Sequence, residues 1–131
     1  MGLDLCARLL APEHPGTKLR IPENGRVSAE EIFALYDTDS LCRTLTDNAA
    51  KSLANLLMNL TRFCDPEKIV LCGGVMTGGF ILEKIKTHLN SFTMRYVTGG
   101  VALSSIPPQD IGIMGACANA ITMKNQEVIH A

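Results

Sequence analysis

The 131-residue sequence has little charge for its size. Charged residues make up 19% of it and hydrophobic residues 47%, whereas about 25% of an ordinary globular domain is charged. The hydrophobic content is enough for a packed core, which argues against disorder. The shortage of solvated side chains predicts that part of the surface is buried against something else. The length allows either one ordinary domain or a part of a larger one.

An excess of basic residues is also missing. Twelve Lys and Arg stand against 13 Asp and Glu, which gives a formal net charge of −1. Binding to a phosphate backbone by bulk electrostatics needs a basic surface. We therefore expect no direct nucleic-acid binding by this chain.

Long apolar runs are absent from the sequence as well. A membrane helix needs roughly 18 consecutive apolar residues, and no run here approaches that length. The first residues, Met1–Asp4, carry neither the basic nor the apolar region of a signal peptide. We therefore expect neither a membrane span nor export.

The cysteines form no recognisable framework. There are five, an odd number, and no two of them make a CxxC pair. This spacing predicts neither a disulfide scaffold nor a zinc site and favours a reduced, cytoplasmic protein. The histidines are also too scattered for a metal motif such as HExxH, so the sequence offers no metal ligand and no candidate catalytic residue. The positions are Cys6, Cys42, Cys64, Cys72 and Cys117, and His14, His88 and His130.

Proline and glycine divide the chain into an irregular beginning and an ordered remainder. Five of them fall between Pro12 and Gly25, a density that predicts extended loop after a short helix from Asp4 to Leu10. We expect an irregular N-terminal segment over residues 1–27, an α/β unit over residues 28–124 and a frayed tail over residues 125–131.

Two helices should open the ordered part. Ser28, with Glu31 three residues later, has the sequence of a capping box and predicts a short helix through Tyr36. The carboxylates of the polar break 37–40 can cap a second helix of roughly 23 residues, which Pro66 must end. Apolar residues recur along this helix at spacings of three and four, which predicts one buried leucine-rich face. They are Leu41, Leu45, Ala49, Leu53, Leu56, Leu57, Leu60 and Phe63.

A short apolar run, Lys68–Cys72, predicts a strand buried on both faces. A glycine-rich turn over residues 73–79 follows it, and an amphipathic helix should then run from Phe80 to near Asn90. The order of strand, glycine turn and helix is typical of the opening of a βαβ unit.

The remaining apolar runs leave two alternatives open. Met94–Val97 and Val101–Ser105 are either two strands or one strand preceded by irregular chain. Pro107 and Pro108 end the second run, and Asp110 then stands where a helix cap is expected. The last helix should carry four spaced apolar residues, Ile111, Met114, Ala118 and Ile121.

The glycine turn is the most informative feature for function. Glycines at the carboxyl end of a buried strand let a ligand approach the backbone without a Cβ in the way. The helix that follows can point its free amides and positive dipole end at that ligand, and a nucleotide suits this arrangement. Gly74 and Gly78 are separated by three residues, so neither GxGxxG nor GxxxxGK[ST] is present. A tight connection without a ligand is the alternative.

Several segments together resemble one protein family. Asp65–Val75, read as DPEKIVLCGGV, resembles the DPE-x-IVLGGGV segment of the ROK family of bacterial sugar kinases, sugar-responsive repressors and open-reading-frame homologues. Leu53–Leu56 resembles the LANL segment of that family's long helix. Gly112–Ala116 resembles its C-terminal GxxGAA helix. The resemblance covers about residues 26–122.

The resemblance implies an α/β fold, namely the C-terminal subdomain of an actin-like ATPase (ribonuclease H-like) fold with a short central sheet flanked by helices. In such kinases the glycine turn flanks the purine and ribose of ATP. Gly73 and Gly74 would then approach the adenosine, with Val75 and Thr77 close by. This sequence departs from the motif at its first glycine, which is Cys72 here, and a side chain at that position narrows the approach.

The implied function is that of the C-terminal part of a ROK-like sugar kinase, contributing the adenosine side of an ATP site that also uses Mg²⁺ in the complete protein. The family's DxGGT-like phosphate loop, its aspartate general base and its zinc motif are not found in this sequence. We therefore expect the chain alone to be inactive and to meet sugar only with the missing N-terminal half. The alternatives are a fragment of a sugar-responsive transcriptional regulator or a non-enzymatic dimerisation or scaffold module. A homo-oligomer is expected, because family members usually dimerise.

Overall fold

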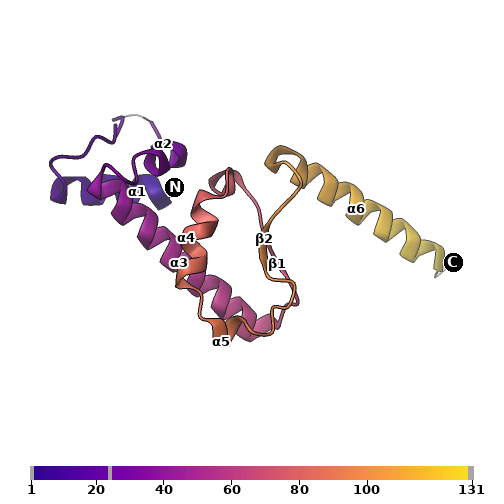
Figure 1. Cartoon of the computed structure of the whole chain (residues 1–131). Helices are drawn as coiled ribbons and strands as arrows, with labels where there is room; N and C mark the ends of the chain where they lie inside the picture. Colours follow the sequence, from indigo (N-terminus) through magenta and orange to yellow (C-terminus); the bar gives the residue numbers. More distant parts are fainter. Residues whose placement is uncertain (1, 24, 130–131) are drawn as a thin grey trace.

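The computed structural model describes residues 2–23 and 25–129. The fold is mostly helical, with one small two-stranded parallel sheet (Figure 1). The long helix α3 forms the spine of the body, with α1 and α2 packed near its beginning, α4 packed along it and α5 packed near its end. In chain order the elements are α1 (Gly2–Leu10), η1 (Ala11–Glu13), α2 (Ala29–Ala34), α3 (Ser40–Cys64), β1 (Ile69–Leu71), η2 (Gly74–Met76), α4 (Phe80–His88), α5 (Ser91–Met94), β2 (Val101–Leu103) and α6 (Pro108–Ile129).

Helix α3 begins and ends where the sequence predicts. The carboxylate of Asp39 caps it, because Oδ1 accepts hydrogen bonds from the amides of Leu41 at 2.9 Å and Cys42 at 3.0 Å. At the other end Asp65 takes a left-handed conformation with φ of 46°, and Pro66 then prevents a further turn. The expected long helix is therefore confirmed, and its cap comes from the predicted polar break.

The N-terminal segment is packed onto this spine. The short helix expected from Asp4 is present as α1 and starts at Gly2, whereas the described residues of 14–28 form neither helix nor strand. The Arg8 guanidinium donates to the carbonyls of Pro22 and Gly25, both at 2.7 Å, which holds the loop against the helix. A first core cluster lies between the loop, α1, α2 and the start of α3. Its buried members are Ala7, Leu19, Val27, Ile32, Leu41, Cys42 and Leu45.

Ser28 caps helix α2 as predicted, but not with the hydrogen bond of a capping box. The Ser28 hydroxyl accepts from the amide of Glu30 at 3.2 Å, one residue earlier than in a capping box. The helix ends at Ala34 rather than at Tyr36.

The predicted leucine-rich face of α3 is only half covered. Helix α4 and the sheet cover one side of α3 and form a second core cluster. The buried members of this cluster are Ala50, Ala54, Leu57, Ile81 and Ile85. The neighbouring side is open: Leu56 is 51% exposed, Leu60 42% and Phe63 90%. The expectation that these three residues are buried is therefore wrong, because within the described chain no element lies over that side of the helix.

Strands β1 and β2 pair in parallel, with Ile69 opposite Val101 and Leu71 opposite Leu103. Helices α4 and α5 connect them, which confirms the βαβ unit. The prediction that β1 is buried on both faces is wrong, because Val70 is 53% exposed. Ile69 and Leu71 point toward the second core cluster, so the intervening side chain points to the face that the described helices leave open.

The run before β2 forms no strand, which settles the two alternatives in favour of a single strand. Residues Met94–Val97 end α5 and enter a turn that places Gly100 at φ of 69°. A Cβ at Gly99 would lie 2.9 Å from the Lys68 Cβ, so only glycine fits where the two strands begin.

Helix α6 starts at Pro108, and proline suits the first turn because it lacks only an amide that has no helical partner there. Asp110 therefore lies inside the first turn of the helix and is not its cap. The helix continues to Ile129, past the end expected near residue 124, and residues 130 and 131 lie outside the described part. None of the described helices combines the length and the apolarity needed to cross a membrane.

Candidate functional site

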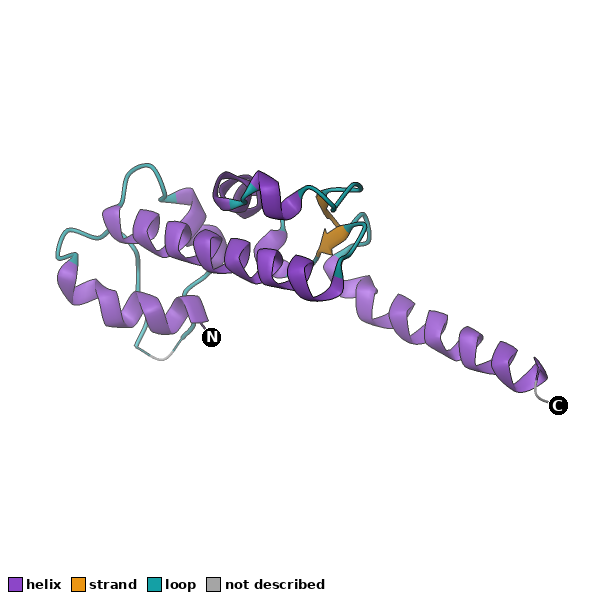
Figure 2. Ribbon diagram, turned by 90° about the horizontal axis from the view of Figure 1, so that it is seen from below, coloured by secondary structure: helices purple, strands orange, loops and turns teal. Residues whose placement is uncertain are grey.

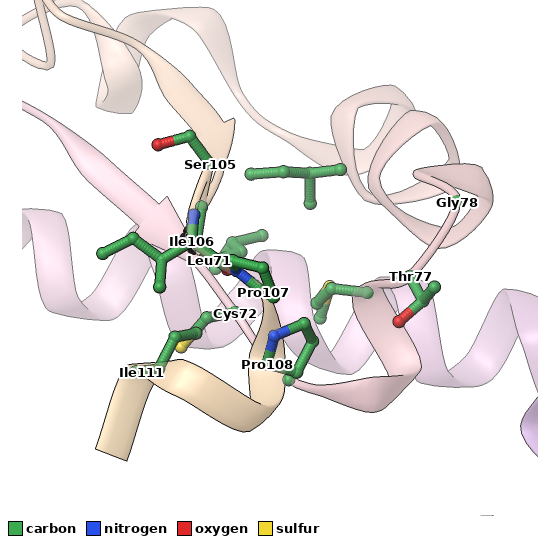
Figure 3. A pocket seen from close by; sticks show the side chains of 13 residues that line it. Leu71, Cys72, Thr77, Gly78, Ser105, Ile106, Pro107, Pro108 and Ile111 are labelled. Carbon is green, nitrogen blue, oxygen red and sulfur yellow. Dashed lines mark hydrogen bonds between the residues drawn. The ribbon is translucent and has the colours of Figure 1, made fainter. Parts of the chain in front are cut away.

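The carboxyl ends of β1 and β2 open into a hollow of about 210 Å³ (Figure 3). Because the two strands are parallel and in register, the segments that leave them meet at the same edge of the sheet. The glycine turn forms one wall, and the connection from β2 into α6 forms the other. The lining residues are Leu71, Cys72, Gly73, Met76, Thr77, Gly78, Leu103, Ser104, Ser105, Ile106, Pro107, Pro108 and Ile111.

The shape of the first wall depends on Gly73. Its φ of 115° and ψ of 166° are accessible essentially only to glycine. The chain then makes the short 3₁₀ turn η2, closed by the amide of Met76 donating to the carbonyl of Gly73 at 3.0 Å. Among the residues 2–23 and 25–129, no atom outside the turn's own neighbours lies within 4 Å of the place where a Cβ would stand at Gly73 or Gly74. The glycines thus make a tight connection and also leave the backbone of the turn accessible.

Two of the four residues predicted to approach a nucleotide line the hollow. These are Gly73 and Thr77. Gly74 lies on the turn between them without lining it. Val75 lines a separate apolar groove of about 560 Å³ between α1, α3 and η2. The turn therefore separates the four predicted residues: it presents Gly73 and Thr77 to the hollow and Val75 to the apolar groove on its other side.

The helix after the glycine turn was expected to point its free amides at a ligand in this hollow, and the structure does not place it so. Because η2 intervenes, α4 starts only at Phe80, and none of the residues of its first turn lines the hollow. Phe80 instead packs against the rings of Phe33, at 5.5 Å between centroids, and Tyr36, at 5.4 Å. The start of α4 therefore serves the packing of α2 against α4.

The second wall was not predicted from the sequence. The Ser104 hydroxyl accepts from the amide of Ile106 at 3.0 Å, which bends the chain as it leaves β2. Pro107 and Pro108 then turn it into α6, and Ile111 closes the hollow beside Cys72 (Figure 3). The signal that could have found this wall is a second strand of the same βαβ unit followed directly by serines and prolines.

No charged side chain of the described part of the chain lines the hollow. Its polar groups are the hydroxyls of Thr77, Ser104 and Ser105, the Cys72 thiol and the backbone of the turn. Such a lining can hold an uncharged, partly apolar ligand group, but it supplies neither a general base nor a carboxylate for a metal ion. Among the described residues, no group of three or more His, Cys, Asp and Glu side chains is placed to hold a metal.

Two groups with clearly shifted pKa values lie away from the hollow, at the start of α3. Burial raises the pKa of the Cys42 thiol to about 12, and the charge of Asp39 acts in the same direction. Burial alone would raise the pKa of Asp39, but hydrogen bonds from the amides of Lys18, Cys42 and Leu41 and from the Thr17 hydroxyl outweigh it and lower the pKa. The Cys42 shift stems mainly from burial in the first core cluster, and the Asp39 shift from the hydrogen bonds that cap α3 and hold the N-terminal loop, so both indicate a structural role.

A parallel βαβ unit that carries a glycine turn at the carboxyl edge of its sheet defines a class of ligand-binding α/β folds. The sequence places the chain within a particular family: the profile of the ROK family matches residues 15–123, and the chain belongs to that family. The matched range includes both walls of the hollow and leaves α1 outside. Membership implies an actin-like ATPase fold.

The curated relatives that the chain matches are kinases by name. A glucokinase of Halalkalibacterium halodurans is 29% identical over 108 residues, which cover 79% of this chain and 33% of the relative. A beta-glucoside kinase of Listeria monocytogenes is 26% identical over 101 residues, covering 76% of this chain and 33% of the relative, and that of Listeria innocua matches to the same extent. The chain thus spans about a third of the length of these relatives.

Proposed function

We propose that this chain supplies the adenosine-binding wall of the ATP site of a ROK sugar kinase, as the C-terminal subdomain of its actin-like ATPase fold. The observation that carries the proposal is the uncharged hollow at the carboxyl ends of β1 and β2, closed on one side by the glycine turn. The family match spans this hollow. The relatives described above are named as kinases, which favours a kinase parent over a transcriptional regulator.

The lining of the hollow fits the uncharged end of ATP better than its phosphates. Leu71, Ile106 and Ile111 offer apolar contact to a purine, and the hydroxyls of Thr77 and Ser105 offer hydrogen bonds to a ribose or a base edge. The open backbone at Gly73 allows a flat group to approach closely. When bound, ATP supplies the phosphoryl group, and its Mg²⁺ finds no carboxylate among the lining residues of this hollow.

The hollow is also smaller than a complete binding site for a small molecule. Pockets for whole small molecules usually measure about 300–1,000 Å³, and this one measures about 210 Å³. Phosphoryl transfer requires the phosphates, the metal and the sugar hydroxyl in one cleft. We therefore assign the transfer, with glucose or a β-glucoside as the candidate acceptor, to an assembly that includes the other two thirds of the kinase fold.

The proposal is tested by titrating the chain with ADP in a calorimeter. Saturable binding is expected, and Thr77→Phe should abolish it, because this exposed side chain lines the hollow and makes no side-chain hydrogen bond within the described structure that the fold would lose. The matched control is Thr98→Phe, an exposed threonine outside the hollow, which should bind as the unmodified chain does. Equal binding by the two variants would contradict the assignment.

A second assay tests whether phosphoryl transfer needs the rest of the kinase fold. In a coupled ATP-consumption assay with glucose, other hexoses and β-glucosides, the purified chain should give no turnover above background, because the lining residues that the structure describes include no charged group to act on the phosphates. Sugar-dependent turnover by this chain alone would refute the claim that the transfer needs the rest of the fold.

A further inference from the structure

The segment that connects β2 to α6 has few backbone donors with which to fix its shape. Residues 104–107 form neither helix nor strand and lead from the sheet into the projecting helix α6 (Figures 1 and 2). Two of the residues at 105–108 are prolines, which have no amide hydrogen. The shape of this wall of the hollow must therefore depend on side chains as well as on the backbone.

Ser104 supplies a side chain that shapes the wall. Its amide donates to the carbonyl of Leu71 at 2.8 Å, which ties Ser104 to the end of β1. Its hydroxyl accepts from the amide of Ile106 at 3.0 Å and donates to the carbonyl of the same residue at 3.3 Å. Ser104 is thus fixed to the sheet through its backbone and holds Ile106 through its side chain.

Ile106 carries this constraint into the hollow. Its half-buried side chain lines the hollow together with Leu71 at the ends of the two strands (Figure 3). Without the Ser104 hydroxyl, the amide and the carbonyl of Ile106 would both lose this hydrogen-bond partner. The wall would then be free to move away from the glycine turn that faces it.

The three hydroxyls that line the hollow differ in what they are free to bind. The Ser104 hydroxyl uses its one hydrogen and one of its acceptor positions on Ile106, which leaves it no donor for a ligand. The hydroxyls of Thr77 and Ser105 line the same hollow and make no hydrogen bond within the part of the chain that the structure describes. Thr77 and Ser105 are therefore available to a ligand, whereas Ser104 is engaged with the wall itself.

We propose that Ser104 is a positioning residue for the nucleotide, because its hydroxyl holds Ile106 at the place where the side chain packs on the base. The inference rests on the function proposed above, since Ile106 meets a purine only if the hollow takes adenosine. Apolar contact weakens over a gap of a fraction of an ångström. A serine that makes no contact of its own with the base thus controls the affinity for the nucleotide.

The test compares Ser104→Thr with Ser104→Val in a calorimetric titration with adenosine. The two variants form a matched pair, because threonine and valine have nearly the same shape and only threonine keeps the hydroxyl. Ser104→Thr should bind adenosine as the unmodified chain does. Ser104→Val should bind it about fivefold more weakly, the factor that corresponds to the net loss of one hydrogen bond. Both variants should keep the circular dichroism of the unmodified chain.

A double-mutant cycle with Ile106→Ala tests whether Ser104 acts through Ile106. Ile106→Ala alone should weaken adenosine binding, and the addition of Ser104→Val should weaken it no further, because the side chain that Ser104 positions is gone. Additive losses would overturn the inference by showing that Ser104 acts on the ligand independently. Equal affinities of Ser104→Thr and Ser104→Val would also overturn it, while leaving the proposed function in place. An unmodified chain that binds no adenosine would overturn both.

Discussion

Asp39 joins the irregular N-terminal loop to the start of α3, and its removal should destabilise the whole fold. The side chain is almost completely buried, with 3% of its surface exposed. One carboxylate oxygen caps α3 through the amides of Leu41 and Cys42. The other accepts from the Thr17 hydroxyl at 2.9 Å and from the amide of Lys18. Asp39→Ala removes all four hydrogen bonds at once.

The size of the effect follows from these contacts. Loss of a helix cap costs about 1 kcal/mol. Loss of hydrogen bonds to a charged group, with their donors left partly buried, costs about 2 kcal/mol more. The free energy of unfolding should therefore fall by about 3 kcal/mol, a large part of the roughly 5–15 kcal/mol that stabilises an ordinary domain. The melting temperature should fall by about 10 °C.

Urea denaturation followed by circular dichroism measures this loss, with both proteins at one concentration because association also affects stability. Asp37→Ala is the matched control. It changes the same residue type in the same loop, but Asp37 is exposed and its carboxylate makes no hydrogen bond within the described structure, so the change should stay within about 0.5 kcal/mol. Equal losses in the two variants would refute the view that the buried carboxylate joins the loop to the helix.

Three further predictions follow from the same contacts and from the hollow. The pKa of Asp39 is held below its ordinary value of 3.8, so the stabilisation that its carboxylate provides is complete above pH 3.8 and is lost as the pH falls through the lower folded pKa. The free energy of unfolding in urea should therefore fall less between pH 7 and pH 3 for Asp39→Ala than for the unmodified chain. An equal fall would contradict this. The Cys42 thiol is fully buried, with its pKa raised to about 12, so a thiol reagent at neutral pH should label four of the five cysteines quickly and the fifth only on unfolding; fast labelling of all five would show that the start of α3 is open. Cys72→Gly restores the glycine of the family motif and removes a side chain from the hollow, so it should tighten ADP binding in calorimetry; unchanged or weaker binding would mean that the thiol does not restrict the approach.

The sequence predicted those parts of the fold that depend on local chemistry. The position of α3 follows from an aspartate cap and a proline stop. The βαβ unit follows from the order of an apolar run, a glycine turn and a helical pattern. The turn was also identified as the candidate site, because glycines at the carboxyl end of a strand let a ligand approach the backbone, with a tight connection without a ligand as the alternative. Gly73 and Thr77 line the hollow, whereas Gly74 and Val75 do not.

Features that depend on distant parts of the chain were not predicted. Periodicity shows which side of α3 is apolar, but not how much of that side a neighbour covers, so the exposure of Leu56, Leu60 and Phe63 was missed. The apolar run of β1 predicted two covered faces, whereas Val70 is exposed. The second wall of the hollow, around Ser104 and Pro107, depends on the parallel register of two strands some thirty residues apart, and no local motif encodes that register.

The central claim is that this chain recognises the adenosine end of ATP rather than its phosphates. It is tested most directly by calorimetry with adenosine and ADP in parallel, at low and at high salt. Because the described residues that line the hollow include no charged side chain, the two ligands should bind with similar affinity, salt should change either affinity little, and Thr77→Phe should abolish both. Binding of ADP alone that weakens steeply with salt, or binding of neither ligand, would contradict the account.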